Sequence, residues 1–349
     1  MSDYSRIESI GAYVPDRSVS TAELLSRLPA EVSIDIEAIT GITARRVAGT
    51  SSLDLAVRAA RDALTTSRYR AADLDVVISC SITRTVEPGC FTLEPSLALA
   101  ICREIGATGA LHFDITNACA GVLTGIKVLD AMIRSGAVRT GLVVSGEDIT
   151  PISDTAIAEI TLPYDPQFAS LTVGDAGSAA ILDVSDDPAD RIEYIELFTA
   201  AEFAAACLGM PSDQRPGVAL YTDNRIMHNE SRYLLWMNAH RDFLDARGSS
   251  FADEGYDVMV HHQVSAPGID FVQVIAAREF GTPMPPHLNV LGDYANTAST
   301  SHLLVLAKFL RDKEIPPGSR VLLIPAASGV VGGFVSTTLT DTAQREMAR

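Results

Sequence analysis

The chain has 349 residues, a hydrophobic fraction of 47% and a formal net charge of −17. This length and apolar content allow a large buried core, and the negative charge argues against nucleic acid or an anionic membrane as a partner, because both are bound through positive charge. The N-terminus lacks the charged and apolar regions of a secretory signal, and no apolar run approaches the roughly 18 residues that cross a bilayer. A cytoplasmic protein is therefore predicted.

Early in the chain lies a locally basic stretch. Six arginines between Arg45 and Arg70 accompany only two acidic residues. Such a stretch either lies on a solvated helix face or meets the phosphates of a coenzyme or carrier. We take Arg45 and Arg46 as the candidate phosphate-binding residues.

Further along, the stretch TNACAG places Cys119 between an apolar strand pattern and a helix pattern. Five cysteines, an odd number without metal-like spacing, indicate reduced thiols rather than disulfides or a zinc site. Apolar residues at helical spacing follow Cys119 as far as Gly136, which ends the pattern. Cys119 is therefore expected in the first helical turn, where unpaired N–H groups favour a thiolate. A small buried thiol is the structural alternative.

The chain also repeats itself, with an offset near 180 residues. The repeated pairs of segments are RIESI and RIEYI, AARDAL and AHRDFL, and LDVVISC and YDVMVHH. Each copy alternates strands with helices, which predicts mostly parallel sheets with helices on their faces. We expect two pseudo-symmetric α/β halves, residues 1–187 and 188–349.

Pseudo-twofold packing would bring equivalent loops of the two halves to one central site. The first half contributes Cys119 at its helix start. The second contributes Asn296 at the corresponding place and His262 at the end of the strand that mirrors LDVVISC. A supported cysteine acts as a nucleophile, and His and Asn donors stabilise an oxygen that gains charge. The symmetry thus favours the nucleophilic interpretation of Cys119.

The motifs ACAG, HQ and ANT in this duplicated plan resemble the thiolase superfamily, specifically its ketoacyl-acyl carrier protein synthase III branch. The segments IGAYVPDRSVS, GITARR and GDAGSAAIL are similar to the same branch, so the resemblance runs nearly end to end. It implies the layered αβαβα thiolase fold and a homodimer. It also implies an acyltransferase without a tightly bound cofactor, whose substrates are thioesters of coenzyme A or acyl carrier protein.

The resemblance also assigns site residues. The family's nucleophile falls on Cys119, its histidine on His262 and its asparagine on Asn296. Its oxyanion hole falls on the backbone N–H groups of Cys119 and Ser328. His261 is the runner-up for the histidine, but neighbouring strand residues point to opposite faces, so only one of the pair is expected in the cavity.

A closer similarity concerns CFTLEPS, TNAC, TDNR and HHQVSAP, which resemble bacterial olefin-pathway enzymes that condense two long acyl-coenzyme A molecules without decarboxylation. In those enzymes a glutamate reaches into the neighbouring subunit's site as a base. That resemblance places the glutamate on Glu94, with Glu87 as the rival. Either residue can instead be a solvated loop carboxylate.

The chain also departs from the synthases of primary metabolism. Those enzymes hold the adenine of coenzyme A between a tryptophan and an arginine just before the GI..RR segment, where this chain reads SIDIEAITGITARR. The single tryptophan, Trp236, lies far away in sequence, and the family's asparagine and arginine after HQ fall on Ser265 and Pro267. These differences favour a specialised, secondary pathway. The four other cysteines, His112, His240 and His287 are expected to be packing or surface residues.

The expected reaction loads an acyl group on Cys119 and then condenses it with a second acyl or malonyl thioester in a Claisen reaction. Ester or amide formation on a hydroxyl or amine acceptor is one alternative, which the retained Asn296 argues against. A catalytically silent partner subunit is the other, and the retained cysteine and histidine argue against it. Acyl length, the choice of donor and the origin of the carbanion stay open.

Overall fold

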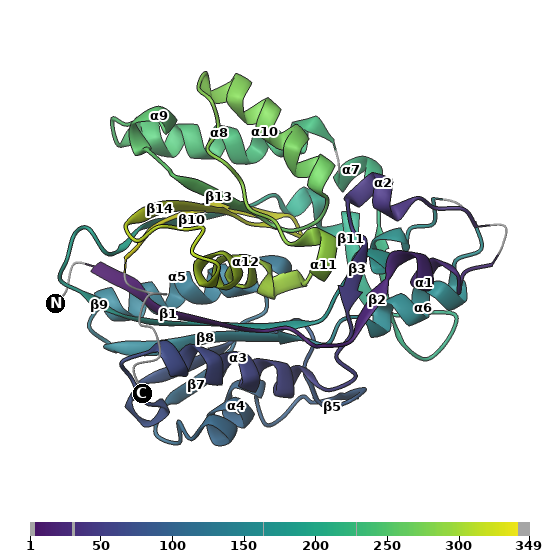
Figure 1. Ribbon diagram of the computed structural model, residues 1–349, viewed down its shortest axis with the longest axis horizontal. Helices are drawn as coiled ribbons and strands as arrows, with labels where there is room; N and C mark the ends of the chain where they lie inside the picture. The colour runs from purple at the N-terminus through teal and green to yellow at the C-terminus, as the bar shows by residue number, and fades with distance from the viewer. Residues whose placement is uncertain (1–3, 30–31, 163, 228, 341–349) are drawn as a thin grey trace.

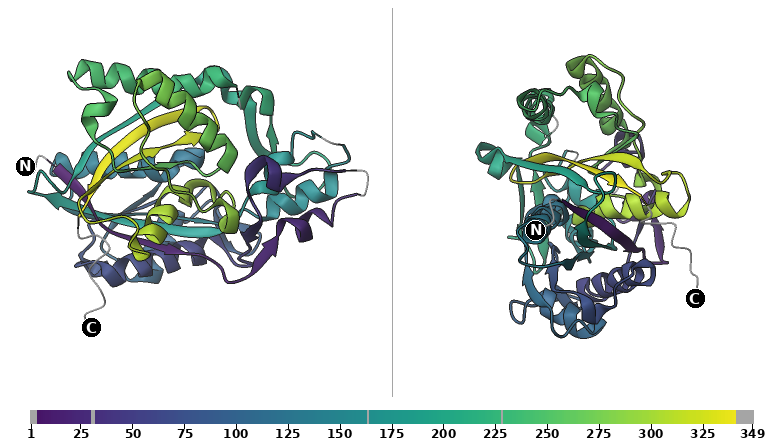
Figure 2. Two further views of the ribbon diagram at one scale, coloured as in Figure 1. Left: turned by 45° about the horizontal axis from the view of Figure 1, so that its top comes forward. Right: turned by 90° about the vertical axis from the view of Figure 1, so that its left-hand side faces the viewer.

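Three helical layers alternate with two β-sheets in the structure, a computed structural model that describes residues 4–29, 32–162, 164–227 and 229–340 (Figure 1). One outer layer holds α3 (Ser52–Thr66) and α4 (Leu97–Ile105), the central layer holds α5 (Gly121–Arg134) and α12 (Ser301–Arg311), and the other outer layer holds α8 (Glu230–Ala246) and α10 (Ala266–Phe280). Figure 2 shows the outer helices on opposite sides of the molecule. This αβαβα layering confirms the predicted thiolase-like fold.

The first sheet has the strand order β1-β9-β8-β4-β7. Its strands are β1 (Tyr4–Tyr13), β4 (Val76–Ser79), β7 (Leu111–Asp114), β8 (Thr140–Glu147) and β9 (Ala176–Ser185). β4 is parallel to β7 and β8, whereas β9 is antiparallel to both β8 and β1. The sheet is therefore mixed rather than mostly parallel. β9, the last of its strands along the chain, runs antiparallel to its neighbour β8 instead of crossing over to a parallel position.

The second sheet has the order β10-β16-β14-β13. Its strands are β10 (Ile192–Thr199), β13 (Val258–His261), β14 (Ser319–Ile324) and β16 (Val331–Leu339), with the short β15 (Ala326–Ala327) beside β16. Only β13 and β14 pair in parallel. The predicted strand HLNVLG forms just an isolated bridge from His287 to Met259. The second sheet thus lacks a full counterpart of β7.

The helix patterns of the sequence explain the layers. α5 and α12 lie between the two sheets, and their apolar side chains join both sheets in one core cluster. α3 instead buries one alanine-rich stripe against the first sheet, which lets the helix approach closely. A Cβ on Gly177 of β9 would collide with the carbonyl oxygen of Leu55, so glycine is required there.

Short elements gather at one end of the layers, at the right of Figure 1, and carry or cover the ends of the strands. The helices among them are α1 (Thr21–Leu25), α2 (Ile36–Thr40), α6 (Pro151–Glu159), α7 (Asn224–Met227) and α11 (Leu291–Tyr294). The strands are β2 (Ser18–Ser20), β3 (Ala44–Arg46), β11 (Cys207–Pro211) and β12 (Val218–Thr222). Elsewhere lie α9 (Phe251–Glu254), β5 (Thr85–Glu87) and β6 (Cys90–Phe91).

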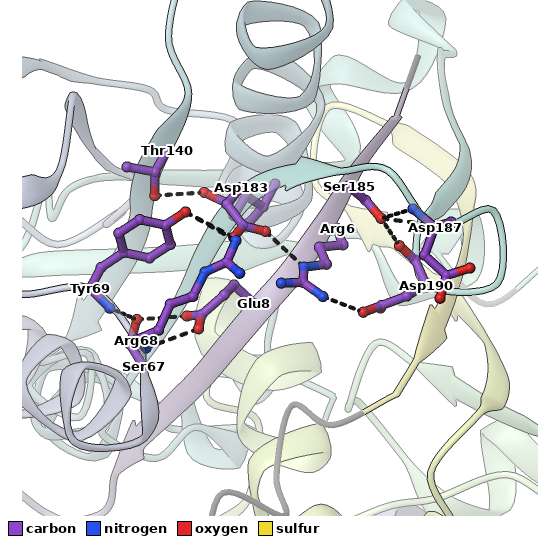
Figure 3. Close-up of polar contacts among 11 residues, drawn as sticks. Arg6, Glu8, Ser67, Arg68, Tyr69, Thr140, Asp183, Ser185, Asp187 and Asp190 are labelled. Carbon is purple, nitrogen blue, oxygen red and sulfur yellow. Dashed lines mark hydrogen bonds and ion pairs between the residues drawn. The ribbon is translucent and has the colours of Figure 1, made fainter. Parts of the chain in front are cut away.

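A buried ion-pair network holds the connection between the two sheets (Figure 3). Arg6 of β1 contacts Asp183 of β9 at 2.9 Å and Asp190, which lies just before β10, at 2.6 Å. Asp183 is fully buried and is also bonded by Arg68 and Tyr69 from the loop after α3. The network therefore fixes where the first sheet ends and the second begins.

We expect Arg6→Met to lower the free energy of unfolding by about 1.5 to 3 kcal/mol, because it leaves buried carboxylate oxygens without a charged donor. Urea denaturation measures this change. The control is Arg27→Met, which breaks an exposed ion pair with Asp154 and should change the free energy by less than about 1 kcal/mol. Equal effects of the two substitutions would contradict a special role for the network.

Candidate active site

One cavity of about 220 Å³ brings Cys119, His262 and Asn296 together. Cys119 comes from the first half of the chain, and the other two residues come from the second. Most of the remaining wall is apolar, with Leu220, Met227 and Val272 among its side chains. A cavity of this kind, apolar with a few convergent polar groups, is typical of a small-molecule site.

Cys119 lies in a short 3-10 turn, η2 (Ala118–Ala120), directly before α5. The turn packs against Ala327 and Val331 of the second half, and Ala118 has φ of 44°, an uncommon backbone conformation for a residue with a side chain. Burial, with smaller contributions from nearby Cys207 and Glu147, raises the pKa of Cys119 to about 12. Burial thus opposes the thiolate that the start of the helix is expected to favour, and the thiolate stays a prediction.

His262 follows the last residue of β13 and donates its backbone N–H to the carbonyl oxygen of Ile324 at 3.0 Å. Its ring lies 6.0 Å from that of His302, nearly parallel to it. Burial, with a smaller contribution from His302, lowers the pKa of His262 to about 3. The imidazole is thus neutral at physiological pH, and its Nδ1 has no hydrogen-bond partner among the described residues.

His261 also lines the cavity, although only one histidine of the pair was expected there. Its ring lies 5.9 Å from that of Trp236, and its Nε2 is 3.2 Å from the side-chain nitrogen of Gln273. The rings of His261 and His262 therefore have different neighbours, as alternation along a strand requires. Both meet the cavity because it extends around the end of β13.

Asn296 has a side chain whose orientation is fixed by one contact. Its Oδ1 accepts the backbone N–H of Ala298 at 2.9 Å, so the oxygen faces the backbone and the NH₂ group is left as a donor. The backbone of Asn296 bonds to Thr172 and Gly174 of the first half, at 3.0 Å each. The amide is thus held by the fold, with no acceptor for its NH₂ group among the described residues.

The repeat also includes this site, but it pairs different residues than expected. η5 (Ala298–Thr300) precedes α12 as η2 precedes α5, and Ala298 has φ of 53° where Ala118 has 44°. The position equivalent to Cys119 is therefore Ser299, not Asn296. Ser299 is buried and donates to the carboxylate of Glu147.

Glu94 and Glu87 do not reach the cavity of their own chain. Both are exposed, Glu87 at the end of β5 and Glu94 in the loop before α4. Leu93, beside Glu94, is 73% exposed, and Phe91 in the same segment is 59% exposed. The single chain therefore leaves Glu94 as a loop carboxylate next to exposed apolar side chains.

The basic stretch is not a free cationic surface. Arg45 is buried and donates to the carbonyl oxygen of Leu171, so its guanidinium points into the protein rather than toward a ligand. Arg46 donates to Asp16 O at 3.2 Å and lies over the ring of Tyr294. Neither arginine lines the cavity with Cys119. The candidate phosphate-binding role of Arg45 is therefore wrong, because β2–β3 pairing turns its side chain inward.

Ser328 lines the cavity close to a second thiol. Its hydroxyl donates to Sγ of Cys207 at 2.9 Å, and Cys207 also lines the cavity. Cys207 was expected to be a packing or surface residue, and Trp236 was noted only as far in sequence from the GI..RR segment, yet both line the cavity. Of these two cavity residues, only Trp236 could have been found from the sequence, because it lies in the helix pattern that follows TDNR. Cys207 has no recognisable motif around it.

The described residues contain no group of three or more His, Cys, Asp or Glu side chains arranged to hold a metal ion. Within those same residues no helix is long and apolar enough to span a membrane.

The layered fold and the Cys, His and Asn cavity define a thiolase-superfamily enzyme of the condensing type. Two models of one family, 3-oxoacyl-acyl-carrier-protein synthase III and its C-terminal part, match residues 113–201 and 247–337, together just over half of the chain. The chain belongs to this ketoacyl synthase III-like family.

Relatives along the whole chain agree. The β-ketoacyl-acyl-carrier-protein synthase III of Deinococcus deserti is 28% identical over 330 residues, covering 93% of this chain and 88% of the relative. That of Laribacter hongkongensis is 27% identical over 340 residues, covering 95% and 97%.

Two solved structures are similar in fold. A cysteine-to-serine variant of OleA from Xanthomonas campestris, solved with lauric acid and lauroyl-CoA, has a TM-score of 0.83 at 22% identity and covers 97% of this chain and 100% of that chain. The priming β-ketosynthase of the R1128 polyketide pathway has a TM-score of 0.81 at 26% identity and covers 98% of each chain.

The neutral state of Cys119 predicts its reactivity. In the free enzyme, we expect the rate of Cys119 alkylation by iodoacetamide to rise about tenfold per pH unit from pH 7 to 10, because the thiolate fraction stays small below a pKa of about 12. Peptide mass spectrometry measures the rate, with exposed Cys90 as the accessibility reference and Cys119→Ser as the control. A plateau below pH 9 would show that Cys119 is already a thiolate.

Proposed function

We propose that this enzyme loads an acyl group on Cys119 and condenses it with a second acyl or malonyl thioester to form a β-ketoacyl product. The observation that carries the proposal is the fixed amide of Asn296. Its oxygen is held by Ala298, so an NH₂ donor remains in the cavity that also contains Cys119 and His262. A donor placed in this way suits the oxygen of an enolate, which gains negative charge during condensation.

In the loading step, the neutral thiol of Cys119 must lose its proton as sulfur attacks the thioester carbonyl. Neutral His262 is the available base in the cavity, and it returns the proton to the departing thiol. The carbonyl oxygen, which becomes negatively charged, is stabilised by the backbone N–H groups of Cys119 and Ser328. Acyl-enzyme and free coenzyme A or carrier thiol result.

In the condensation step, the second thioester loses carbon dioxide or an α-proton to give a carbanion. Asn296 and His262 donate to the enolate oxygen of this carbanion while its carbon attacks the acyl group on Cys119. The acyl–sulfur bond then breaks, and the released Cys119 sulfur takes up a proton again. Because Nδ1 of His262 has no partner that fixes one tautomer, the same ring can accept a proton during loading and donate one here. Ester formation would leave the Asn296 donor without an enolate to stabilise.

The proton-abstracting base we assign to Glu94 of a second subunit. Glu94 cannot act in its own cavity, and exposed Phe91 and Leu93 beside it suit burial against another copy of the chain. β7 lies at the end of the first sheet, where Leu111 is 61% exposed, so a second copy can extend the sheet there. We therefore propose a homodimer in which each cavity receives Glu94 from the other subunit.

We further propose a specialised pathway rather than the fatty-acid starter reaction. The stacking pair for the adenine of coenzyme A is missing from SIDIEAITGITARR, and Ser265 and Pro267 replace the expected residues after HQ. OleA and the R1128 priming ketosynthase are among the similar structures.

We also propose that the two halves of the chain, residues 1–187 and 188–349, share one active site.

Asn296→Ala should leave acyl loading within about twofold of wild type but lower condensation by about 10²- to 10³-fold, because the enolate loses a donor. Asn296→Asp is the matched variant, since it keeps an oxygen for Ala298 but lacks the NH₂ group. Intact mass spectrometry reads the acyl adduct, and product analysis reads condensation. Cys119→Ala should show no adduct. Equal loss of loading and condensation in both Asn296 variants would mean that Asn296 only holds the fold.

Subunit mixing tests Glu94. Cys119→Ala and Glu94→Ala homodimers should each be inactive in condensation without decarboxylation, whereas co-expression should restore about a quarter of wild-type activity. Random pairing makes half of the dimers mixed, and each mixed dimer has one complete site of two. Glu87→Ala is the control and should retain activity. If co-expression restores no activity, Glu94 does not act in the active site of the neighbouring subunit.

A further inference from the structure

A buried carboxyl group of the first half is bonded to the turn that follows Asn296 in the second half. Glu147, at the end of β8, is fully buried, and the hydroxyl group of Ser299 in η5 donates to its Oε1. Ser299 is also fully buried and does not line the cavity. Neither Glu147 nor Ser299 has a part in the loading or condensation steps described above.

The same turn sets the orientation of the Asn296 amide. The Oδ1 atom of Asn296 accepts the backbone N–H of Ala298 at 2.9 Å, and Ala298 directly precedes Ser299. Ala298 has φ of 53°, an uncommon conformation that persists only where surrounding contacts hold it. A shift of η5 would therefore move the N–H group that fixes the amide, and the NH₂ donor of Asn296 would lose its direction.

Three links thus connect the first sheet to the amide: the bond from Ser299 to Glu147, the covalent step back to Ala298, and the bond from Ala298 to Asn296. We propose that Ser299 is a positioning residue for condensation, because it holds the turn that directs the NH₂ group of Asn296 at the enolate oxygen. A donor stabilises that oxygen only in a narrow range of distance and angle. The proposal rests on the condensing function proposed above.

Ser145 provides a matched control on the same carboxyl group. It is fully buried, and its hydroxyl group donates to Oε1 of Glu147 at 3.2 Å and lies 2.6 Å from the hydroxyl group of Ser299. Replacing either serine by alanine removes one donor from Glu147 together with this shared contact. Only Ser299→Ala separates the turn from Glu147, because Ser145 lies in β8. Glu147 is left unchanged, since it also accepts the backbone N–H groups of Ile82 and Thr83.

Separate assays of the two half-reactions test the positioning role. In Ser299→Ala we expect condensation to fall about 10- to 100-fold, while acyl loading of Cys119 stays within about twofold of wild type. Ser145→Ala should keep both half-reactions within about twofold, because the turn stays attached to Glu147. Intact mass spectrometry reads loading, and product analysis reads condensation. Equal loss of condensation in the two serine variants, or equal loss of both half-reactions in Ser299→Ala, overturns the proposal.

A double variant shows whether Ser299 acts through Asn296. Once Asn296→Ala has removed the amide, adding Ser299→Ala should lower condensation by no more than about a further twofold. A structural role that is independent of the amide would instead multiply the losses of the two single variants. Multiplied losses therefore contradict the positioning role, even if each single variant behaves as expected.

Hydrogen-exchange mass spectrometry adds a measurement that does not depend on activity. Backbone N–H groups of residues 296–300 should exchange about tenfold faster in Ser299→Ala than in wild type, and Ser145→Ala should leave them unchanged. Unchanged exchange in Ser299→Ala overturns the proposal. A wild-type enzyme that loads Cys119 but forms no β-ketoacyl product counts against the condensing function instead, and the exchange contrast then still decides whether Ser299 holds the turn of Asn296.

Discussion

The geometry of the cavity depends on the hydrogen bonds that Glu147 accepts. This fully buried carboxylate at the end of β8 accepts backbone N–H groups from Ile82 at 2.9 Å and Thr83 at 3.0 Å, and hydroxyl groups from Thr83, Ser145 and Ser299. Leaving such a group without donors would cost several kcal/mol. Because Ser299 belongs to the turn after Asn296, Glu147 fixes that turn against the first sheet.

A second constraint is the mostly apolar wall around the reacting groups. Burial raises the pKa of Cys119 and lowers the pKa of His262, so both groups are neutral when no substrate is bound. A neutral thiol is protected from reagents in water but reacts only when a base and a carbonyl are placed beside it. The free enzyme therefore favours a protected nucleophile over a permanently activated one.

The sequence predicts the layered fold because its repeat and its apolar periodicity can be recognised from the order of the residues alone. It predicts the meeting of Cys119, His262 and Asn296 because the repeat brings equivalent loops together. It does not predict the antiparallel return of β9, which depends on pairing across the whole half. Nor does it predict Arg232 and Cys207 in the cavity wall, since α8 and β11 reach the wall through packing between distant elements. The inward turn of Arg45 likewise follows from its pairing partner, Val19, in β2.

The matching turns at Ala118 and Ala298 have different roles in the two copies of the duplicated fold. Both copies keep the same uncommon backbone, yet one presents a thiol to the cavity and the other presents a hydroxyl to Glu147. The copy at Ser299 serves as a structural anchor, and that leaves the copy at Cys119 free to carry a reactive group. Placing a thiol at Ser299 would consequently not create a second reactive centre, because the side chain there faces the buried carboxyl group of Glu147 and the hydrogen bond to it would be lost.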